Sequence, residues 1–468
     1  MSELETTPVS RRNMELLLLL LALAVAMAAY YLVGINSDGG MSQEFISQGL
    51  ILAALSLVFH VILRIWAKYA DPVILPVTVA LNGIGLAMIH RIDLARTTDA
   101  AFRQILWTGV AMVIAMIVLW AIRDHRVLRR FTYIALAASV LLLLLPLIPG
   151  LGVIINGARI WVRVGSVLSF QPGELAKITL AIFFAGYLSS NRELILLAGR
   201  KFGPLQLPRA RDLGPMVVAW LVSIGVLVIQ RDLGSSILFF GLFMVMIYVA
   251  TARVSWIVIG VLMLAGGGTF AYLTMSHVTR RINGWLNAFD PEIFHAQGGS
   301  SQIVEGLFGL ANGGLLGTGL GNGSPYMVPL ANSDMIVASL GEELGLIGLS
   351  AIVLCYLILV SRGMRAALGS RDTFGKLLAT GLSFTVGLQC FVVIGGVTRL
   401  IPLTGLTTPF MAAGGSSLLS NWIIVALLLL ISHNSRRPIL SGVSATAEVA
   451  TRAPRSGGLF GKRKESQR

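Results

Sequence analysis

The chain has 468 residues, of which 55% are hydrophobic and only 12% are charged. Soluble domains carry roughly a quarter charged residues, so this composition excludes an ordinary water-soluble protein and predicts a chain embedded in a lipid bilayer. The formal charge of +14 would suggest a nucleic-acid partner in a soluble protein. In a membrane protein Lys and Arg collect in cytoplasmic loops, so we expect no nucleic-acid partner.

Apolar segments of about twenty residues recur along the chain, and each is long enough to cross a bilayer as a helix. We predict an all-α polytopic membrane protein with about twelve transmembrane helices. The first follows Arg11 and Arg12 and is too long for the core of a secretory signal, so we interpret it as a retained helix. The predicted spans are 14–33, 45–67, 73–90, 105–122, 131–149, 172–190, 213–229, 233–250, 255–276, 334–361, 377–397 and 416–433.

The distribution of basic residues predicts how these helices are oriented. Lys and Arg concentrate in alternate connections, for example within 123–130 and 362–376, which the positive-inside rule assigns to the cytoplasm. An even number of spans then places both termini in the cytoplasm. We expect residues 1–13 to form a cytoplasmic N-terminus and 434–468 to form a basic, disordered cytoplasmic tail.

Two connections on the predicted outer side, 150–171 and 277–333, are longer than simple linkers. Long ordered loops in membrane and soluble domains are usually functional. The second lies between the ninth and tenth helices, is rich in glycine and contains helix-like apolar stretches. We therefore expect a large structured extracytoplasmic loop that folds onto the membrane surface.

Several basic residues on the outer side depart from the positive-inside trend. Arg binds pyrophosphate in a bidentate manner, so a group of them predicts an anionic ligand. The alternative for any single Arg is anchoring at the membrane interface by snorkelling. These residues are Arg159, Arg163, Arg231, Arg280, Arg281 and Arg399.

Charged residues also occur inside the predicted spans, where an ionisable group is costly and usually functional. Glu174 and Lys177 are one helical turn apart and can pair on one helix face, either as a functional pair or as a neutralised structural pair. Glu342 and Glu343 lie within the tenth span. The spacing of His, Cys and carboxylate residues predicts no metal site.

Six ordered motifs occupy residues 157 to 417. They are Gly157-Ala158-Arg159-Ile160-Trp161, Phe170-Gln171-Pro172-Gly173-Glu174-Leu175-Ala176-Lys177, Asp232-Leu233-Gly234, Asn287 to Pro291, Ser333-Asp334 with Gly341-Glu342-Glu343-Leu344-Gly345, and Ile401-Pro402-Leu403-Thr404-Gly405 with Pro409 and Gly414-Gly415-Ser416-Ser417. Together they resemble the SEDS family (shape, elongation, division and sporulation), whose members include RodA and FtsW. In their details the motifs are closer to those of the RodA branch. Gly173 and Arg231 depart from the family, which usually has Ser and Pro there.

The resemblance also implies a division of the chain. The usual family core has about ten helices, so the N-terminal helices at 14–122 would include about two additional ones. The SEDS-like core would occupy 123–433, with an active site formed by the outer loop at 277–333.

The resemblance implies a polymerase of peptidoglycan glycan strands in the bacterial plasma membrane that supports cell elongation and shape. Its substrate would be lipid II, transferred with inversion at the outer face, and undecaprenyl pyrophosphate would be the leaving group. A sugar hydroxyl needs a general base, for which Asp290 is the candidate and Glu292 and His295 are rivals. Pyrophosphate leaves readily and needs cations more than an acid catalyst.

The same resemblance implies which further residues belong to the site. Those expected to contact the substrate are Arg159, Trp161, Arg163, Glu174, Lys177, Asp232, Arg281 and Gln302. Those expected to have structural or interface roles are Asp334, Glu342, Glu343, Pro409, Gly414, Gly415, Ser416 and Ser417. Trp161 is equally well explained as an interfacial anchor.

The family implies a class B penicillin-binding protein as partner, a transpeptidase that crosslinks the strands. No cofactor is predicted, although a divalent cation, Mg²⁺ or Mn²⁺, that assists pyrophosphate departure stays open. Two other functions also stay open, a lipid II flippase and a scaffold that only activates its partner. A flippase needs polar groups reachable from both faces, whereas most candidates here lie near the outer side.

Overall fold

The computed structural model describes residues 10–38, 43–155, 157–165, 168–197, 199–202, 205–208, 210–296 and 298–438. The chain divides into two units, Val9–Arg436 and a second made of Met1–Pro8 and Arg437–Arg468. The first unit holds the described helices and strands. The predicted disordered tail lies outside the described residues from 439 onward, and 434–436 belong to the last helix.

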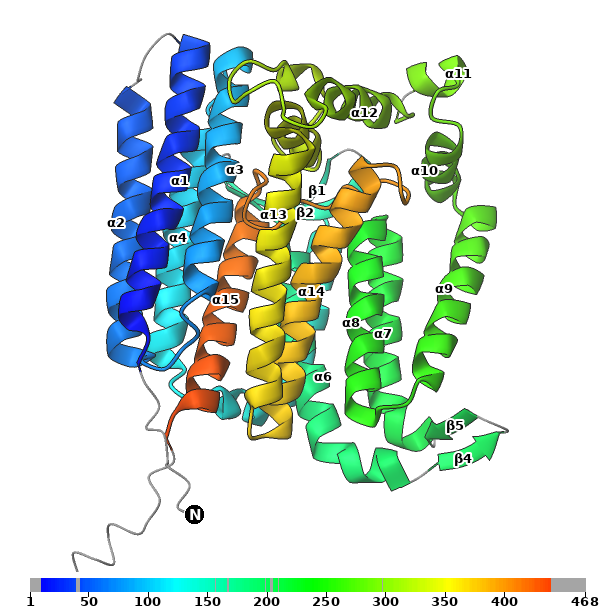
Figure 1. Ribbon diagram of the computed structural model, residues 1–468. Helices are drawn as coiled ribbons and strands as arrows, with labels where there is room; N and C mark the ends of the chain where they lie inside the picture. The colour runs from blue at the N-terminus through cyan, green and yellow to red at the C-terminus, as the bar shows by residue number, and fades with distance from the viewer. Residues whose placement is uncertain are drawn as a thin grey trace, which may run out of the picture. The chain divides into compact units, whose positions relative to one another are not determined.

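Each of the predicted spans coincides with a helix, and these helices stand side by side as a bundle (Figure 1). Apolar residues around the whole circumference of a helix, as here, suit burial in lipid and protein rather than in water. The helices are α1 Arg12–Asp38, α2 Gln43–Trp66, α3 Ile74–Arg96, α4 Ala100–Ala121, α5 Thr132–Leu144, α6 Pro172–Leu197, α7 Ala210–Gln230, α8 Leu233–Thr251, α9 Ser255–Thr274, α13 Ile336–Gly369, α14 Thr373–Val397 and α15 Gly415–Arg436.

Ten of the described helices are long and apolar enough to cross a membrane, where α5 counts together with its flanking 3-10 turns. The two other bundle helices are α6, which carries Glu174 and Lys177 among its charges, and α7, whose apolar part Gly214–Gln230 is shorter. The prediction of a helical, polytopic membrane protein is confirmed, with ten spans that meet the requirements of length and composition.

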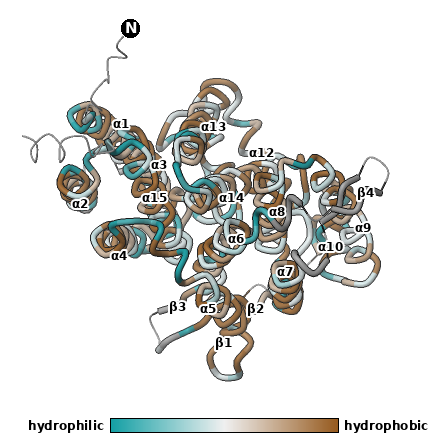
Figure 2. Tube along the Cα trace, turned by 90° about the horizontal axis from the view of Figure 1, so that it is seen from below, coloured by the Kyte–Doolittle hydropathy of each residue, from teal (hydrophilic) through white to brown (hydrophobic). Residues whose placement is uncertain are grey.

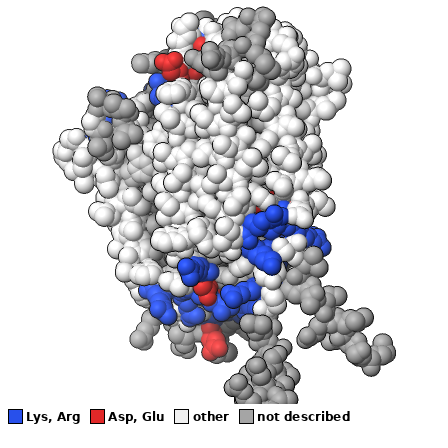
Figure 3. Space-filling model, turned by 90° about the vertical axis from the view of Figure 1, so that its left-hand side faces the viewer, with Lys and Arg blue, Asp and Glu red and all other residues white. Residues whose placement is uncertain are grey.

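The surface of the bundle is consistent with lipid surroundings. Hydrophobic residues predominate along most of the helices in Figure 2, and large apolar side chains such as Leu262 and Phe270 are exposed. Figure 3 shows a broad uncharged belt on one face, with Lys and Arg gathered at the end of the bundle where α1 begins. A charge-free belt bounded by charged ends is the pattern that a bilayer requires.

Five short strands depart from the all-α prediction. β1 Gly152–Ile155, β2 Ala158–Val164 and β3 Leu168–Phe170 form an antiparallel sheet, and β4 Gly199–Phe202 pairs with β5 Leu205–Pro208. Gly157 has a φ of +79° in the turn between β1 and β2, a conformation that glycine adopts without strain. The outer connection 150–171 is therefore a small sheet rather than an irregular loop.

The segment between α9 and α13 is folded, as predicted. It contains α10 Ser276–Leu286, α11 Pro291–His295, α12 Ser301–Gly313 and the 3-10 turn η3 Pro325–Met327. Figure 1 shows α12 lying across one end of the bundle, above α13 and α14. This end is the outer end if the basic end of Figure 3 is cytoplasmic.

Candidate active site

The connection from α14 to α15, residues 398–414, is the structural centre of the candidate site. It is a non-helical segment largely buried among helices, so its carbonyl groups need partners. Side chains from four helices supply them. Asn82 donates to the Phe410 carbonyl at 3.2 Å, Gln104 to Ala412 at 2.9 Å, Gln389 to Thr407 at 2.8 Å, and the Tyr356 hydroxyl donates to the Pro409 carbonyl. Pro409, predicted to be structural, thus serves as an acceptor.

The start of α15 is packed closely against α4. Gly414 N–H donates to Gln104 at 3.1 Å, and Ser416 accepts a hydrogen bond from the Gln171 N–H at 2.8 Å. A Cβ on Gly415 would lie 2.3 Å from the Trp107 ring, so only glycine permits this approach. Ser417 accepts from Asn421 at 3.3 Å.

Arg281 on α10 is tied to this connection from the other side. Its Nη1 donates to the carbonyl oxygens of Thr404 at 2.7 Å and Leu403 at 3.3 Å. Asp232 and Asp334 are its electrostatic partners. The guanidinium is therefore engaged within the protein, in a group that we call the Arg281 cluster: Arg281, Asp232, Asp334 and Gln302.

The two carboxyl groups of the Arg281 cluster are held by local hydrogen bonds. Gln302 on α12 donates to Asp334 at 3.2 Å, and Asp232 caps α8 by accepting the Ser235 N–H at 2.9 Å. Burial raises the pKa of Asp334 above its ordinary value, and the hydrogen bonds from Gln302 and Ser333 and the charge of Arg281 offset only part of that rise. Residues predicted separately for substrate binding and structure thus form one connected group.

Glu174 and Lys177 form a buried ion pair on α6. The Lys177 Nζ lies 2.6 Å from Glu174 Oε2 and donates to Gln389 at 3.0 Å. Ser420 donates to Glu174 at 2.9 Å. Because each charge has both an ionic and a neutral partner, this arrangement suits the alternative of a neutralised structural pair.

Arg159, Trp161 and Arg163 alternate along β2. Trp161 is half-buried and pairs with Val153, whereas Arg163 is exposed and pairs with Ser169. The Nε of Arg159 is buried without a hydrogen-bond partner, beside Gly152 at the start of β1. Arg159 therefore has a donor that is not used within the protein.

Asp290 lies at the start of α11, in the segment between α9 and α13. It is exposed, and its Oδ1 accepts the Glu292 N–H at 2.9 Å as an N-cap. Glu292 and His295, the rival bases, are also exposed on α11. The three candidates are therefore accessible to a ligand, and no hydrogen bond of the described residues links Asp290 to the Arg281 cluster.

Arg399, predicted only as an outer cation, holds the segment that leads to Asp290. Its guanidinium donates to the carbonyl oxygens of Trp285 and Leu286, both at 2.8 Å, and lies over the Phe289 ring, 5.3 Å from its centroid. Trp285 returns a hydrogen bond to the Arg399 carbonyl at 3.0 Å. A cavity of about 470 Å³ opens here, lined by Trp285, Leu286, Leu307, Thr398 and Arg399.

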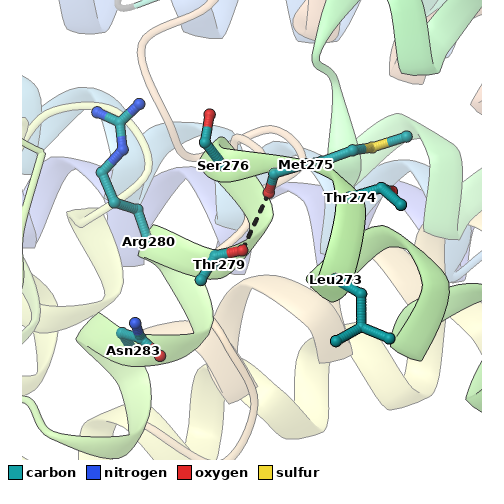
Figure 4. A pocket seen from close by; sticks show the side chains of 7 residues that line it. All are labelled: Leu273, Thr274, Met275, Ser276, Thr279, Arg280 and Asn283. Atoms are coloured by element: carbon teal, nitrogen blue, oxygen red, sulfur yellow. Dashed lines mark hydrogen bonds between the residues drawn. The ribbon is translucent and has the colours of Figure 1, made fainter.

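A second cavity, of about 430 Å³, lies at the junction of α9 and α10 (Figure 4). Figure 4 shows Arg280 extending from the α10 face that also carries Ser276, Thr279 and Asn283. Arg280 is exposed, in contrast to the engaged Arg281. The remaining lining residues are Leu273, Thr274 and Met275.

Further positive charge lies near this cavity. Burial lowers the pKa of His277, and the charges of Arg231, Arg281 and Arg280 lower it further. The three Arg side chains create a positive potential suited to a polyanion in this region, and the lowered pKa of His277 reflects that potential. Sequence reasoning identified the three Arg residues but not His277.

Glu342 and Glu343 hold the glycine-rich connection that follows α12. Glu342 accepts from Asn312 and from the Ser324 N–H, both at 3.0 Å. Glu343 is paired with Arg91 of α3 at 3.1 Å. Both carboxylates are thus engaged within the protein, and their structural or interface role stays a prediction. Among the described residues, no three His, Cys, Asp or Glu side chains gather as a metal site.

The sequence matches the family model of the FtsW, RodA and SpoVE cell cycle proteins over residues 72–437. It is 47% identical to peptidoglycan glycosyltransferase RodA of Mycobacterium tuberculosis strain H37Rv over 438 residues, 92% of either chain. It is 43% identical to the Mycobacterium leprae protein of the same name over 448 residues, 94% of either chain. Stage V sporulation protein E of Bacillus subtilis is 35% identical over 378 residues, 78% of this chain and 98% of that one.

Two solved structures share the fold. One is a peptidoglycan synthase complex described as coordinating polymerization and crosslinking, with a TM-score of 0.55, 24% identity, and coverage of 84% of this chain and 98% of that chain. The other is a variant of rod shape determining protein RodA from Thermus thermophilus, with a TM-score of 0.55, 23% identity, and coverage of 79% and 99%. The chain belongs to the SEDS family of FtsW, RodA and SpoVE proteins, as a homologue of peptidoglycan glycosyltransferase RodA.

Proposed function

We propose that this protein polymerises peptidoglycan glycan strands from lipid II at the outer face of the bacterial plasma membrane, in support of cell elongation and shape. The observation that carries the proposal is the 47% identity, over 92% of the chain, to a peptidoglycan glycosyltransferase. The exposed carboxylate of Asp290 and the basic region around Arg280 supply the two kinds of group that the reaction needs.

Asp290 is the proposed general base. One carboxylate oxygen accepts the Glu292 N–H, which orients the group and leaves the second oxygen for the acceptor hydroxyl. The hydroxyl oxygen attacks the anomeric carbon of the donor while its proton passes to Asp290. The bond from that carbon to the phosphate oxygen breaks on the opposite side, so the configuration inverts and undecaprenyl pyrophosphate leaves with the electron pair.

The leaving pyrophosphate needs cations that are not already engaged. Arg159 has an unbonded Nε, and Arg280 is exposed at a cavity, so we assign the anion-binding role to these two. Arg281 and Lys177 have internal partners and would act by positioning α10 and α6. Trp161 and Arg163 would lie on β2 beside Arg159, in reach of lipid or sugar.

The membrane topology follows from the same proposal. We infer twelve transmembrane helices, α6 and α7 included, with both termini in the cytoplasm, because the basic end of Figure 3 then faces inward. The matched family region begins at residue 72, after α1 and α2, so these two helices would be the additional ones. A class B penicillin-binding protein is the proposed partner, because a synthase complex that coordinates polymerization and crosslinking shares this fold.

The base assignment is tested by three variants in a lipid II polymerisation assay: Asp290→Asn, Glu292→Gln and His295→Ala. Asn is also a good N-cap, so Asp290→Asn removes the base and preserves the start of α11. We expect it to lower turnover roughly 100-fold or more, the usual contribution of a general base. The two other variants should stay active. Full activity of Asp290→Asn with loss in Glu292→Gln would overturn the assignment.

A further inference from the structure

We infer that α1, a helix outside the matched family region, braces the outer catalytic segment, with Asn36 as a positioning residue. It acts on the glycine segment, residues 317–323, which joins α12 to η3 and α13. This inference rests on the proposed function and adds to it a role for a helix that precedes residue 72.

Direct contacts join the outer end of α1 to the glycine segment. Asn36 Nδ2 donates to the Leu320 carbonyl at 2.6 Å, and Ser37 Oγ donates to the Gly321 carbonyl at 3.4 Å. Gly321 has a φ of +89°, and a Cβ there would lie 2.7 Å from the Asn36 Cβ. The backbone of the segment therefore rests on α1, with no room for a side chain between them.

The opposite side of the glycine segment is bound to α13. Glu343 accepts the Gly321 N–H at 2.9 Å through its side chain, and its carbonyl accepts the Gly319 N–H at 3.0 Å. Arg91 of α3 bonds both Glu343 and, at 2.7 Å, the Gly323 carbonyl. Gly321 is thus held from both sides, by α1 through its carbonyl and by α13 through its N–H.

The helix α1 is itself packed closely against α3 and α2. A Cβ on Gly83 of α3 would lie 2.3 Å from the Ala26 Cβ of α1, the close approach that small residues allow between membrane helices. The Tyr30 hydroxyl donates to Gln48 of α2 at 3.0 Å. Contacts therefore close a ring from α1 through the glycine segment, Glu343 and Arg91 to α3, and back to α1.

This ring reaches the candidate site through α12. Asn312 near the end of α12 donates to Glu342, the neighbour of Glu343, and Gln302 near its start donates to Asp334 of the Arg281 cluster. Loss of the Asn36 contact would let the glycine segment and α12 shift together relative to that cluster. Small displacements of this kind lower the rate of chemistry more than they weaken substrate binding.

The test compares Asn36→Asp, Asn36→Gln and the control Asn13→Ala in the full-length protein. Asn36→Asp keeps the shape but replaces the donor by a carboxylate that faces the Leu320 carbonyl, whereas Asn36→Gln retains a donor amide. Asn13 lies at the opposite end of α1, where it accepts a hydrogen bond from Arg64. Lipid II polymerisation gives kcat and KM, and hydrogen exchange reports the protection of 317–323.

For Asn36→Asp we expect a kcat lowered roughly tenfold or more with little change in KM, and faster exchange of 317–323. Asn36→Gln should recover most of the kcat, and Asn13→Ala should leave both readouts unchanged. Wild-type kcat and protection in Asn36→Asp would overturn the inference. If the wild type makes no glycan, the proposed function fails. In that case, unchanged hydrogen exchange of residues 317–323 in Asn36→Asp would separately overturn the positioning role of α1.

Discussion

At the scale of single residues, Arg280 and Arg281 show that neighbouring residues on one helix can have different roles. Arg281 donates to two backbone carbonyls and interacts with the carboxyl groups of Asp232 and Asp334. Arg280 is exposed and extends from α10 in Figure 4. Consecutive residues on a helix lie about 100° apart around its axis, which separates the two environments. The sequence groups both as outer cations, and the family resemblance adds only Arg281 to the expected substrate contacts.

The variants Arg281→Ala and Arg280→Ala should therefore behave differently. Loss of Arg281 removes charged hydrogen bonds, each worth roughly 2 kcal/mol, and should lower the melting temperature of the purified protein. Loss of Arg280 should leave the melting temperature unchanged and raise KM for lipid II. Thermal unfolding and polymerisation kinetics together separate the two roles. Equal melting temperatures for both variants would contradict the positioning role of Arg281.

Asp372, in the connection between α13 and α14, predicts a pH dependence of stability. Burial raises its pKa, but hydrogen bonds from His125 and the Gly375 N–H and the nearby charges outweigh that effect, so the folded pKa lies below the ordinary 3.8. A lowered carboxyl pKa contributes stability that is present above the unfolded pKa and lost as the pH falls through the folded value.

The variant Asp372→Asn tests this pH dependence. We expect a lower melting temperature than wild type at neutral pH and a smaller further decrease below pH 3.8, since the titrating group is gone. Melting temperatures of both proteins, measured from neutral pH to below pH 3.8, test this expectation. Parallel curves for variant and wild type would mean that another group dominates the acid response.

At the scale of elements, the pair Glu174 and Lys177 on α6 separates a structural role from a catalytic one. Removing one partner of a buried ion pair typically costs roughly 3–5 kcal/mol, whereas replacing both by apolar or neutral residues is often well tolerated. Glu174→Gln and Lys177→Met should each destabilise the protein, and the double variant should recover much of the loss. A stable double variant without polymerase activity would assign the pair to the reaction instead.

The helices were predictable because, in the bilayer core, a helix satisfies the hydrogen bonds of the backbone within one segment. Each bundle helix also corresponds to a long apolar run in the sequence. The short strands around Trp161 were not, since a few residues of period-two alternation give a weak signal. The sequence also could not predict that Asn82 and Gln104 belong to the site. Their partners are backbone carbonyls more than three hundred residues away, which leave no mark in the sequence.

At the scale of the whole molecule, the charge-free belt and the basic end in Figure 3 agree with a protein fixed across a bilayer. The folded segment between α9 and α13 lies at the opposite end, together with Asp290, Arg280 and the Arg281 cluster. Concentration of the candidate groups at one end favours chemistry at one membrane face. A flippase would instead need polar groups reachable from both faces.

The most direct test of the proposed function is polymerisation of labelled lipid II by the purified protein, with and without the proposed class B penicillin-binding partner. Asp290→Asn serves as the matched variant. We predict long glycan products from the wild type and none from the folded variant. Absence of polymer from the wild type even with the partner present, together with lipid II translocation in liposomes, would contradict the polymerase and establish the flippase.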